Sequence, residues 1–431
     1  MRRRPVSFTV ALAVIGFALH ARAQQPPESP HKIVAVRAAR MLDVKTGSMV
    51  RNAVVLIDDD KITASGSGLA IPAAATVIDL GNATLLPGLI DCHTHLMARM
   101  SDDPNAYALD LLTKSQAFRA LEGAADARVT LQAGFTSVRD VESEGSGYAD
   151  VALRDAINQG LVEGPRMQVS TRAIAAVGSY HPFGISPDIE NFPTGAQMIS
   201  GVEEARRAAR EQISHGADWL KVYADWGRPT LNLDEIQVIV EEAHKKRRKV
   251  AAHADSPEAI RNALTAGVDS IEHGTLADRS LLEMMKQKNV FWVPTRAAIA
   301  GDLETMTDPN SRKRLQEAIE RGRQNLAIAR EIGVKIASGF DASSAATQGH
   351  NAREIVELNR LGVPPVDAIR AATASAAELM GWQDKVGSLE PGRFADMIAV
   401  AGDPLAAITE LENVKFVMKG GEVVKNQLPA H

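Results

Sequence analysis

This chain of 431 residues has a single cysteine, few aromatic residues and no excess of positive charge. The single cysteine, Cys92, cannot form an internal disulfide bond, so the fold must be stabilised by its core. Aromatic residues make up only 4% of the chain, which argues against a base-stacking surface. Lysine and arginine number 48 against 53 acidic residues, for a net charge of -5, so no phosphate-binding surface is indicated. We therefore expect no nucleic-acid partner.

The rest of the composition is that of an ordinary folded protein. Hydrophobic residues make up 45% of the chain and charged residues 23%, which excludes disordered, collagen-like and polytopic membrane proteins. A length of 431 residues allows two or three domains, or one large barrel with an appendage.

Residues 1–23 have the pattern of a secretory signal peptide. Three consecutive arginines begin it, an apolar stretch follows over residues 6–19, and Ala21 and Ala23 form a small-x-small cleavage site. The apolar stretch is short for a membrane span, so an uncleaved anchor is the less favoured alternative. We expect a periplasmic or secreted protein that is free of the membrane after cleavage.

The pattern of apolar residues changes twice along the chain, and these changes predict its organisation. After a polar linker at residues 24–30, residues 31–86 contain short strand-like runs separated by polar turns. Residues 385–431 return to the same texture, so we expect both chain ends to build one small β-sandwich domain. Between them, residues 87–384 alternate short apolar runs with helical stretches, which is typical of α/β proteins with a parallel sheet.

The number of apolar runs in this central region predicts a (β/α)8 TIM-like barrel. Helical stretches such as residues 202–216 and 256–267 have apolar residues at i, i+3 and i+4 and end in glycine, as outer helices do. The candidate strands are residues 88–91, 135–139, 166–170, 218–223, 250–253, 270–273, 290–294 and 334–338.

Residues that can bind metals end several of these strands. His93 and His95 lie two apart in LIDCHTHL, so both imidazoles point to the same side of a strand and can chelate one ion. His253 and His273 close two further strands, and Asp341 follows the last one. Because the carboxyl ends of barrel strands meet at one face, these side chains are expected to form one metal site.

Lys221 ends the fourth predicted strand, where a buried cation is costly. Burial and nearby divalent ions lower the pKa of an amine, and a neutral amine can add carbon dioxide to give an anionic carbamate. Lys221 is therefore a candidate bridge between two metal ions, and a solvated lysine beside the barrel mouth is the alternative.

The order of these residues resembles that of the metal-dependent amidohydrolase superfamily over essentially the whole mature chain. The segments LLPGLIDCHTHL and AATASAAELMGWQDKVGSLEPGRFADMIAV carry this resemblance. The segments LKVYAD and VAAHA are similar to the group that holds imidazolonepropionase-like proteins, Xaa-Pro dipeptidases and ochratoxin-type amidohydrolases.

The resemblance implies a binuclear centre of two divalent ions, with zinc as the first choice. The ligands that it implies are His93, His95 and Asp341 for one ion, His253 and His273 for the other, and the carboxylated Lys221 with a hydroxide as bridges. Two such ions lower the pKa of a shared water. Asp341 would accept the proton of the attacking hydroxide and deliver it to the leaving amine. Family members are often homo-oligomers, which implies the same for this chain.

A carboxylate-bearing substrate would need cations or hydrogen-bond donors near the metals. Arg172 follows the third predicted strand, and His181 lies in the loop after it. Tyr223 points where Lys221 points, because the two residues alternate along one strand. Packing under a loop for Tyr223 and a surface position for His181 are the alternatives. Further candidates are Arg139 and Arg296.

The sequence thus predicts an exported amidohydrolase that cleaves an amide or peptide bond in a small-molecule substrate, such as a dipeptide, an Xaa-Pro, an N-acyl amino acid or an ochratoxin-like compound. One alternative is a mononuclear cyclic-amide hydrolase, similar to imidazolonepropionase, or a deaminase; either would be indifferent to replacement of Lys221. The non-enzymatic alternative is a periplasmic metal- or solute-binding protein, which would not need Asp341.

Overall fold

The computed structural model describes residues 31–101, 103–181, 185–186, 188–189, 192–226 and 229–429. The predicted signal peptide and linker at residues 1–30 lie outside the described residues. No helix within the described ranges is both long enough and apolar enough to cross a membrane.

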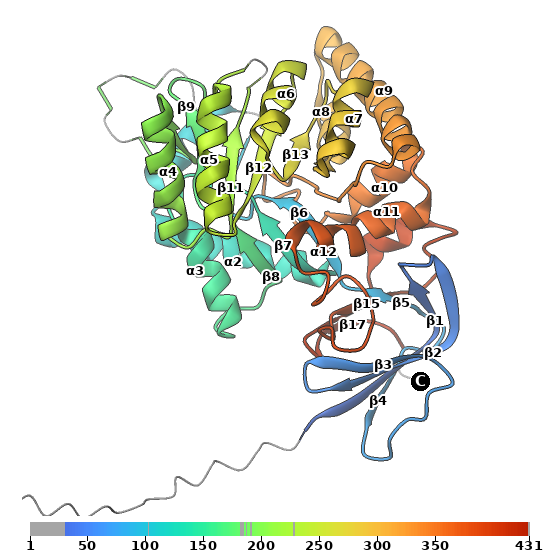
Figure 1. Ribbon diagram of the computed structural model, residues 1–431. Helices are drawn as coiled ribbons and strands as arrows, with labels where there is room; N and C mark the ends of the chain where they lie inside the picture. The colour runs from blue at the N-terminus through green and yellow to red at the C-terminus, as the bar shows by residue number, and fades with distance from the viewer. Residues whose placement is uncertain are drawn as a thin grey trace, which may run out of the picture. The chain divides into compact units, whose positions relative to one another are not determined.

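Both chain ends contribute to one eight-stranded sheet (Figure 1). Its strand order is β17-β16-β15-β5-β1-β2-β3, with β4 paired to β1. The strands from the N-terminal part are β1 Ile33–Asp43, β2 Ser48–Asp58, β3 Lys61–Ser67, β4 Thr76–Asp79 and β5 Thr84–Pro87. Those from the C-terminal part are β15 Met397–Val400, β16 Phe416–Lys419 and β17 Glu422–Asn426. The antiparallel pair β5 and β15 joins the two ends.

An apolar cluster stabilises this sheet. Val36, Val55, Leu85, Met397 and Phe416 are all completely buried in it, and they come from five different strands. Their burial removes a large apolar area from water, which is the main stabilising contribution in such a sheet. The sandwich arrangement and the domain boundaries stay predictions.

Parallel strands make up the rest of the β structure, as the α/β prediction requires. They form a three-stranded sheet, β6-β7-β8, and a six-stranded sheet, β10-β9-β11-β12-β13-β14. Their bounds are β6 Leu89–Thr94, β7 Phe135–Asp140, β8 Arg166–Val169, β9 Ala173–Ala176, β10 Ala196–Ile199, β11 Trp219–Tyr223, β12 Lys249–Ala254, β13 Ser270–His273 and β14 Phe291–Val293.

The first seven predicted strands each coincide with an observed strand to within a few residues. The eighth, residues 334–338, forms only an isolated bridge between Ile336 and Trp292 of β14. Strands β9 and β10 were not predicted, because each is only four residues long, lacks clear alternation and has a single β-branched residue, Ile174 or Ile199.

Backbone hydrogen bonds also connect the two parallel sheets. On one side the Asp218 N–H donates to the Val169 carbonyl at 2.8 Å. On the other side Cys92 of β6 donates to the Ser338 carbonyl at 2.9 Å, and Asp341 donates to the His93 carbonyl at 2.8 Å. These bonds place residues 338–341 beside the carboxyl end of β6. A fully closed eight-stranded barrel stays a prediction.

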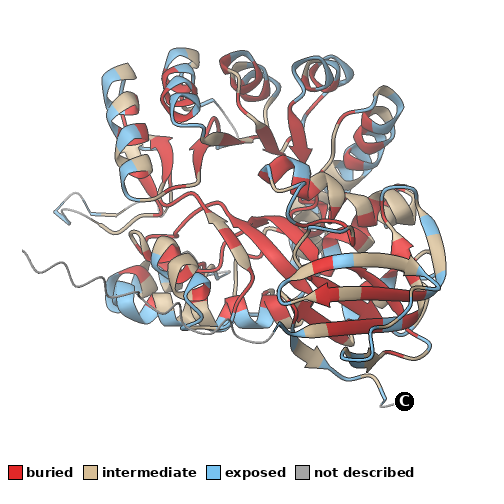
Figure 2. Ribbon diagram, turned by 60° about the horizontal axis from the view of Figure 1, so that its bottom comes forward, coloured by how far each residue is buried: buried red, intermediate tan, exposed pale blue. Residues whose placement is uncertain are grey.

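Helices cover the parallel strands and carry their exposed residues on the side away from them (Figure 2). Two were predicted at residues 202–216 and 256–267, and α4 and α6 confirm them. The helices are α1 Pro104–Thr113, α2 Gln116–Gln132, α3 Ala149–Asn158, α4 Val202–Ser214, α5 Leu233–Lys245, α6 Pro257–Ala266, α7 Arg279–Lys288, α8 Arg296–Thr305, α9 Pro309–Ile332, α10 Ala352–Arg360, α11 Pro365–Ala371 and α12 Ala374–Met380, with a 3-10 turn at Ile408–Asn413.

Candidate metal centre

Histidine and aspartate side chains converge at the carboxyl ends of the parallel strands. His93, His273 and Asp341 each offer a ligand atom, and these atoms lie within 4.8 Å of one another. His95 Nε2 lies 3.3 Å from Asp341 Oδ1. The rings of His253 and His273 have centroids 4.4 Å apart. All the predicted histidine and aspartate ligands are therefore neighbours, although they come from βα units far apart in the sequence.

Acidic residues that were not predicted lie next to these histidines. His95 groups with Glu142 and Glu144 within 4.8 Å, and His95 Nδ1 is 2.9 Å from Glu144 Oε1. His253 groups in the same way with two aspartates, Asp225 and Asp255. Each acid follows a strand by one to four residues, so its strand-end position was the signal that could have revealed it.

His93 is oriented by a buried carboxylate. Its Nδ1 lies 2.8 Å from Glu272 Oε2, and Arg139 donates to the other oxygen of Glu272 at 2.8 Å. Burial and then the charge of Lys221 lower the pKa of His93 to about 4, so the ring is neutral at pH 7. Its Nε2 is buried without a hydrogen-bond partner in the described part of the chain. A neutral histidine held by a carboxylate with its other nitrogen free is suited to bind a metal.

The other ligand candidates have an environment that suits a cation. Burial and the neighbouring His253 lower the pKa of His273 well below its ordinary value. For His95 the effect of burial is outweighed by the nearby carboxylates of Asp341 and Glu144, which raise its pKa well above the usual range. Burial alone would raise the pKa of Asp341, but the neighbouring His93 and His95 hold it well below its ordinary value. The acids around His95 thus favour positive charge at this place.

Lys221 lies in the same centre, and its residue is only 1% exposed. Burial lowers the pKa of its amine, while Glu272 and Asp341 oppose that shift. Its Nζ is 5.2 Å from the centroid of the Tyr223 ring, in line with the predicted shared strand face. The Tyr223 hydroxyl donates to Glu142 Oε2 at 2.6 Å.

His181 belongs to an aromatic cluster beside the centre. Its ring lies 5.4 Å from Trp226 and 4.4 Å from Tyr180, between centroids, and Trp226 stacks on His253 at 5.0 Å. The Tyr180 hydroxyl donates to Glu142, the carboxylate that also accepts from Tyr223. Both ring nitrogens of His181 are buried without a hydrogen-bond partner among described residues, and its role in substrate binding stays a prediction.

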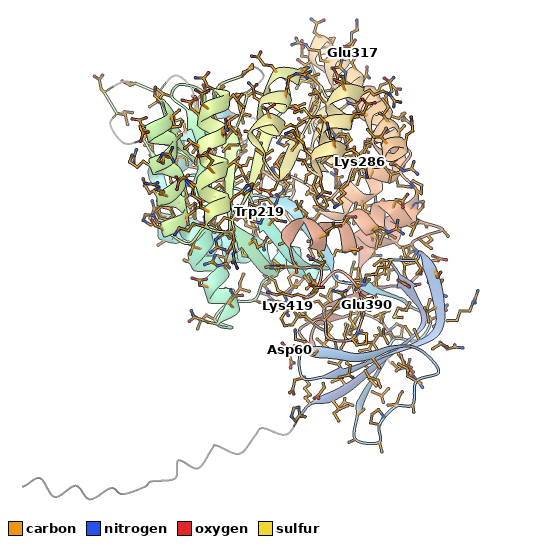
Figure 3. All side chains as sticks on the ribbon, viewed as in Figure 1. Asp60, Trp219, Lys286, Glu317, Glu390 and Lys419 are labelled. Atoms are coloured by element: carbon orange, nitrogen blue, oxygen red, sulfur yellow. The ribbon has the colours of Figure 1, made fainter. Side chains whose placement is uncertain are left out.

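The arginines suggested as receivers of a substrate carboxylate are bound to protein groups. The Arg172 guanidinium donates to the Ala196 carbonyl at 2.9 Å, and its role in substrate binding stays a prediction. Arg139 is completely buried, and its guanidinium carbon lies 4.6 Å from the ring centroid of Trp219, which Figure 3 labels. Arg296 is 2% exposed and donates to the His273 carbonyl at 2.9 Å. Neither Arg139 nor Arg296 is placed to meet a substrate.

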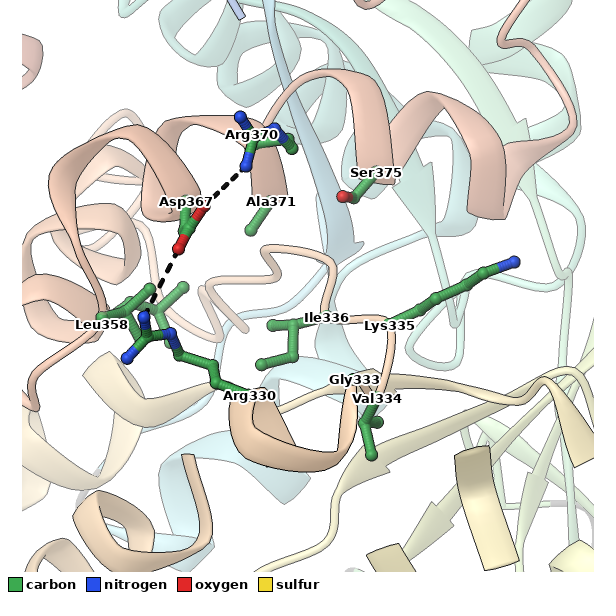
Figure 4. A pocket seen from close by; sticks show the side chains of 11 residues that line it. Arg330, Gly333, Val334, Lys335, Ile336, Leu358, Asp367, Arg370, Ala371 and Ser375 are labelled. Atoms are coloured by element: carbon green, nitrogen blue, oxygen red, sulfur yellow. Dashed lines mark hydrogen bonds and ion pairs between the residues drawn. The ribbon is translucent and has the colours of Figure 1, made fainter. Parts of the chain in front are cut away.

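A separate cavity of about 280 Å³ is lined in part by residues 333–336, which precede Asp341 in the chain (Figure 4). In it Asp367 pairs with Arg370 at 2.5 Å and with Arg330 at 3.6 Å. One carboxylate faces three cationic side chains there, those of Arg330, Lys335 and Arg370, and none of the predicted ligands lines the cavity. The histidine-rich centre is therefore the candidate site.

Comparisons with known proteins agree with this geometry. Residues 84–424 match the amidohydrolase family. Ochratoxinase from Aspergillus niger is 33% identical over 430 residues, covering 91% of this chain and 87% of the fungal protein. The structure of a Xaa-Pro dipeptidase with methionine bound in its active site has a TM-score of 0.81 and 30% identity, covering 91% of this chain and 99% of the other. A prolidase complexed with N-methylphosphonate-L-proline has the same TM-score, 0.81, and 30% identity, covering 92% and 100%.

The family match spans most of the chain, and each of these relatives is similar along nearly its whole length. The resemblance derived from the sequence motifs is thereby confirmed. The chain belongs to the amidohydrolase family and is a hydrolase that acts on carbon–nitrogen bonds.

Proposed function

We propose that this chain is an exported amidohydrolase that binds two divalent metal ions and hydrolyses an amide bond in a small carboxylate-bearing substrate. Dipeptides, Xaa-Pro compounds and N-acyl amino acids are the favoured substrates, with ochratoxin-like amides as a further class. The convergence of the predicted ligands around the buried, unpartnered Nε2 of His93 carries this proposal. The similarity to ochratoxinase and to Xaa-Pro dipeptidases supports the substrate class.

The residues that would hold the ions are those implied by the sequence. They are His93, His95 and Asp341 for one ion, His253 and His273 for the other, and Lys221 as a carbamate between them. Zinc is our first choice because histidine-rich sites suit it. When bound, the ions would activate a water molecule and polarise the substrate carbonyl. The lowered pKa of buried Lys221 supports its addition to carbon dioxide, which releases one proton.

Asp341 is our candidate for proton transfer. Its carboxylate stays ionised because the charges of neighbouring histidines outweigh the effect of burial on its pKa. It can therefore accept a proton from the attacking water and deliver it to the nitrogen of the leaving amine. Tyr223, whose ring lies 5.0 Å from His253, and His181, which stacks on Trp226, would orient the substrate.

For the fold we propose a (β/α)8 barrel flanked by a β-sandwich domain. The bonds from Asp218 to Val169 and from Cys92 to Ser338 support the barrel, because they continue the parallel strand order across both gaps between the sheets. Cleavage of the predicted signal peptide would leave a periplasmic or secreted enzyme, and the family resemblance favours a homo-oligomer.

The decisive experiment is the metal content per chain of the mature protein purified with zinc and bicarbonate. Two ions per chain, falling in Lys221→Ala, would support the binuclear proposal. Lys286→Ala, on the outer helix α7 (Figure 3), is the matched control and should leave the metal content unchanged. One ion in both proteins would favour a cyclic-amide hydrolase or deaminase.

The substrate class is tested with the metal-loaded enzyme. We expect hydrolysis of Xaa-Pro dipeptides or N-acetyl amino acids, measured by release of the free amino acid. Metal-loaded protein that hydrolyses no amide at all would instead support a metal-binding protein without catalysis.

A further inference from the structure

The backbone at His273 has an unusual conformation. His273 has φ of 66°, and the following Gly274 has φ of 61°, so two successive residues are left-handed. Only glycine adopts this region without steric cost, and β-strand residues rarely enter it. A left-handed histidine at a strand end persists only where its surroundings hold it, and such residues cluster at functional sites.

Two side chains from the next βα unit hold the His273 carbonyl. The indole Nε1 of Trp292 donates to this oxygen at 2.8 Å, and the guanidinium of Arg296 donates to it at 2.9 Å. Arg296 Nε also donates to the Pro294 carbonyl at 2.5 Å. Thr295 Oγ1 lies 2.7 Å from Nδ1 of the same histidine, so both the backbone and the ring of His273 are contacted.

Arg296 is a costly residue for this position. It is buried, and the charge of Glu354 only partly opposes the lowering of its pKa by that burial. Its donated hydrogen bonds go to main-chain carbonyls, and its third nitrogen is buried without a partner. An apolar side chain would fill the same space without a desolvated charge, so core packing alone does not explain an arginine here.

Glycines leave the space that the two donors need. A Cβ on Gly322, inside helix α9, would lie 3.1 Å from Cδ of Arg296. A Cβ on Gly274 would lie only 2.8 Å from Nε1 of Trp292. Glycine inside a helix is unfavourable relative to alanine, so the close approach of α9 to Arg296 lowers the local stability of that helix.

We infer that Arg296 and Trp292 are positioning residues that fix His273 in its left-handed conformation and so aim its imidazole at the metal centre. This inference rests on the proposed function, in which His273 is a metal ligand. It gives Arg296 a role in metal binding and not the contact with a substrate carboxylate that its place after strand β14 suggests.

The test is a zinc titration of the mature protein against a chromophoric chelator, together with the melting temperature of the metal-free protein. We expect Arg296→Met to weaken zinc binding by about tenfold to a hundredfold, in the range found when outer-shell partners of metal ligands are lost. Excess zinc should restore part of kcat. Arg154→Met is the matched control, because Arg154 on α3 also donates to a carbonyl, that of Gly216.

Two milder variants keep the inference testable if Arg296→Met does not fold. Trp292→Phe keeps an aromatic ring and removes one donor, and Gly322→Ala pushes on Arg296 from α9. Both should weaken zinc binding by a few fold, whereas Arg154→Met should leave zinc binding unchanged.

Unchanged zinc affinity in all three variants would overturn the inference while leaving the proposed function intact. A lower metal-free melting temperature with wild-type zinc affinity would do the same, because it would assign Arg296 a purely structural role. A wild-type protein that binds no zinc, manganese or cobalt would overturn the proposed function itself, and the inference with it.

Discussion

The charged groups at the two ends of the parallel strands differ in their exposure and in their backbone conformation. At the carboxyl ends, buried His93 lies together with the half-buried His273 and Asp341, and the last two have left-handed backbones. At the start of the eighth predicted strand, residues 334–338, Asp367 pairs with Arg330 and Arg370, whose side chains are 37% and 31% exposed. Buried, strained polar groups are costly, and they are found where ligands bind, whereas solvated ion pairs cost and contribute little.

The strongest test of this contrast is Asp341→Asn against Asp367→Asn. The Asp341 variant should keep much of its metal but lose about a hundredfold to ten-thousandfold in kcat, because the proton carrier is removed. The Asp367 variant should keep its activity. Steady-state hydrolysis of a dipeptide measures both, and near-normal turnover in Asp341→Asn would end its role in proton transfer.

Tyr223→Phe tests whether the aromatic cluster beside the metal centre takes part in the reaction. Its hydroxyl donates to Glu142, and its ring centroid lies 5.0 Å from that of His253. We expect kcat/KM to fall by about tenfold to a thousandfold if the hydroxyl also orients the reacting group. An unchanged kcat/KM would assign Tyr223 to packing alone.

Glu272→Gln tests the buried support of His93. The amide keeps the shape of the side chain but no longer offers two charged acceptors to His93 and Arg139. Zinc affinity should fall by about tenfold to a hundredfold. Glu317→Gln, on the outer helix α9 (Figure 3), should bind zinc like the wild type, and equal affinities in the two variants would contradict the proposed support.

The smallest effect concerns stability away from the metal centre. Burial raises the pKa of Asp150, on α3, from 3.8 to about 6. The folded state therefore holds the proton more tightly than the unfolded state, and the stability that this gives is complete below pH 3.8 and is lost as the pH rises through 6.

Asp150→Asn should remove this pH dependence. Between about pH 4 and 6 the wild type should lose roughly 3 kcal/mol relative to the variant, from about two pKa units at 1.36 kcal/mol each. Urea unfolding at a series of pH values measures the difference. Asp155→Asn on the same helix is the control, and parallel curves for wild type and Asp150→Asn would contradict the prediction.

Strand positions were predictable wherever an apolar run ended in a polar residue. The run before His253 gave β12, because burial on both faces leaves a near-continuous apolar segment. Residues 334–338 have the same pattern, yet they form only one bridge, since hydrogen-bond geometry is not encoded in hydrophobicity. The left-handed backbones of His273 and Asp341 likewise leave no mark in the sequence.

By itself the sequence determined which side chains could bind metals and on which strands they lie, because alternation and chain order set the face of each residue. It could not determine that Glu272 would support His93, or that Glu142 would accept bonds from Tyr180 and Tyr223. Those pairs join different βα units, and only the packing of strands and loops in three dimensions brings them within hydrogen-bond distance.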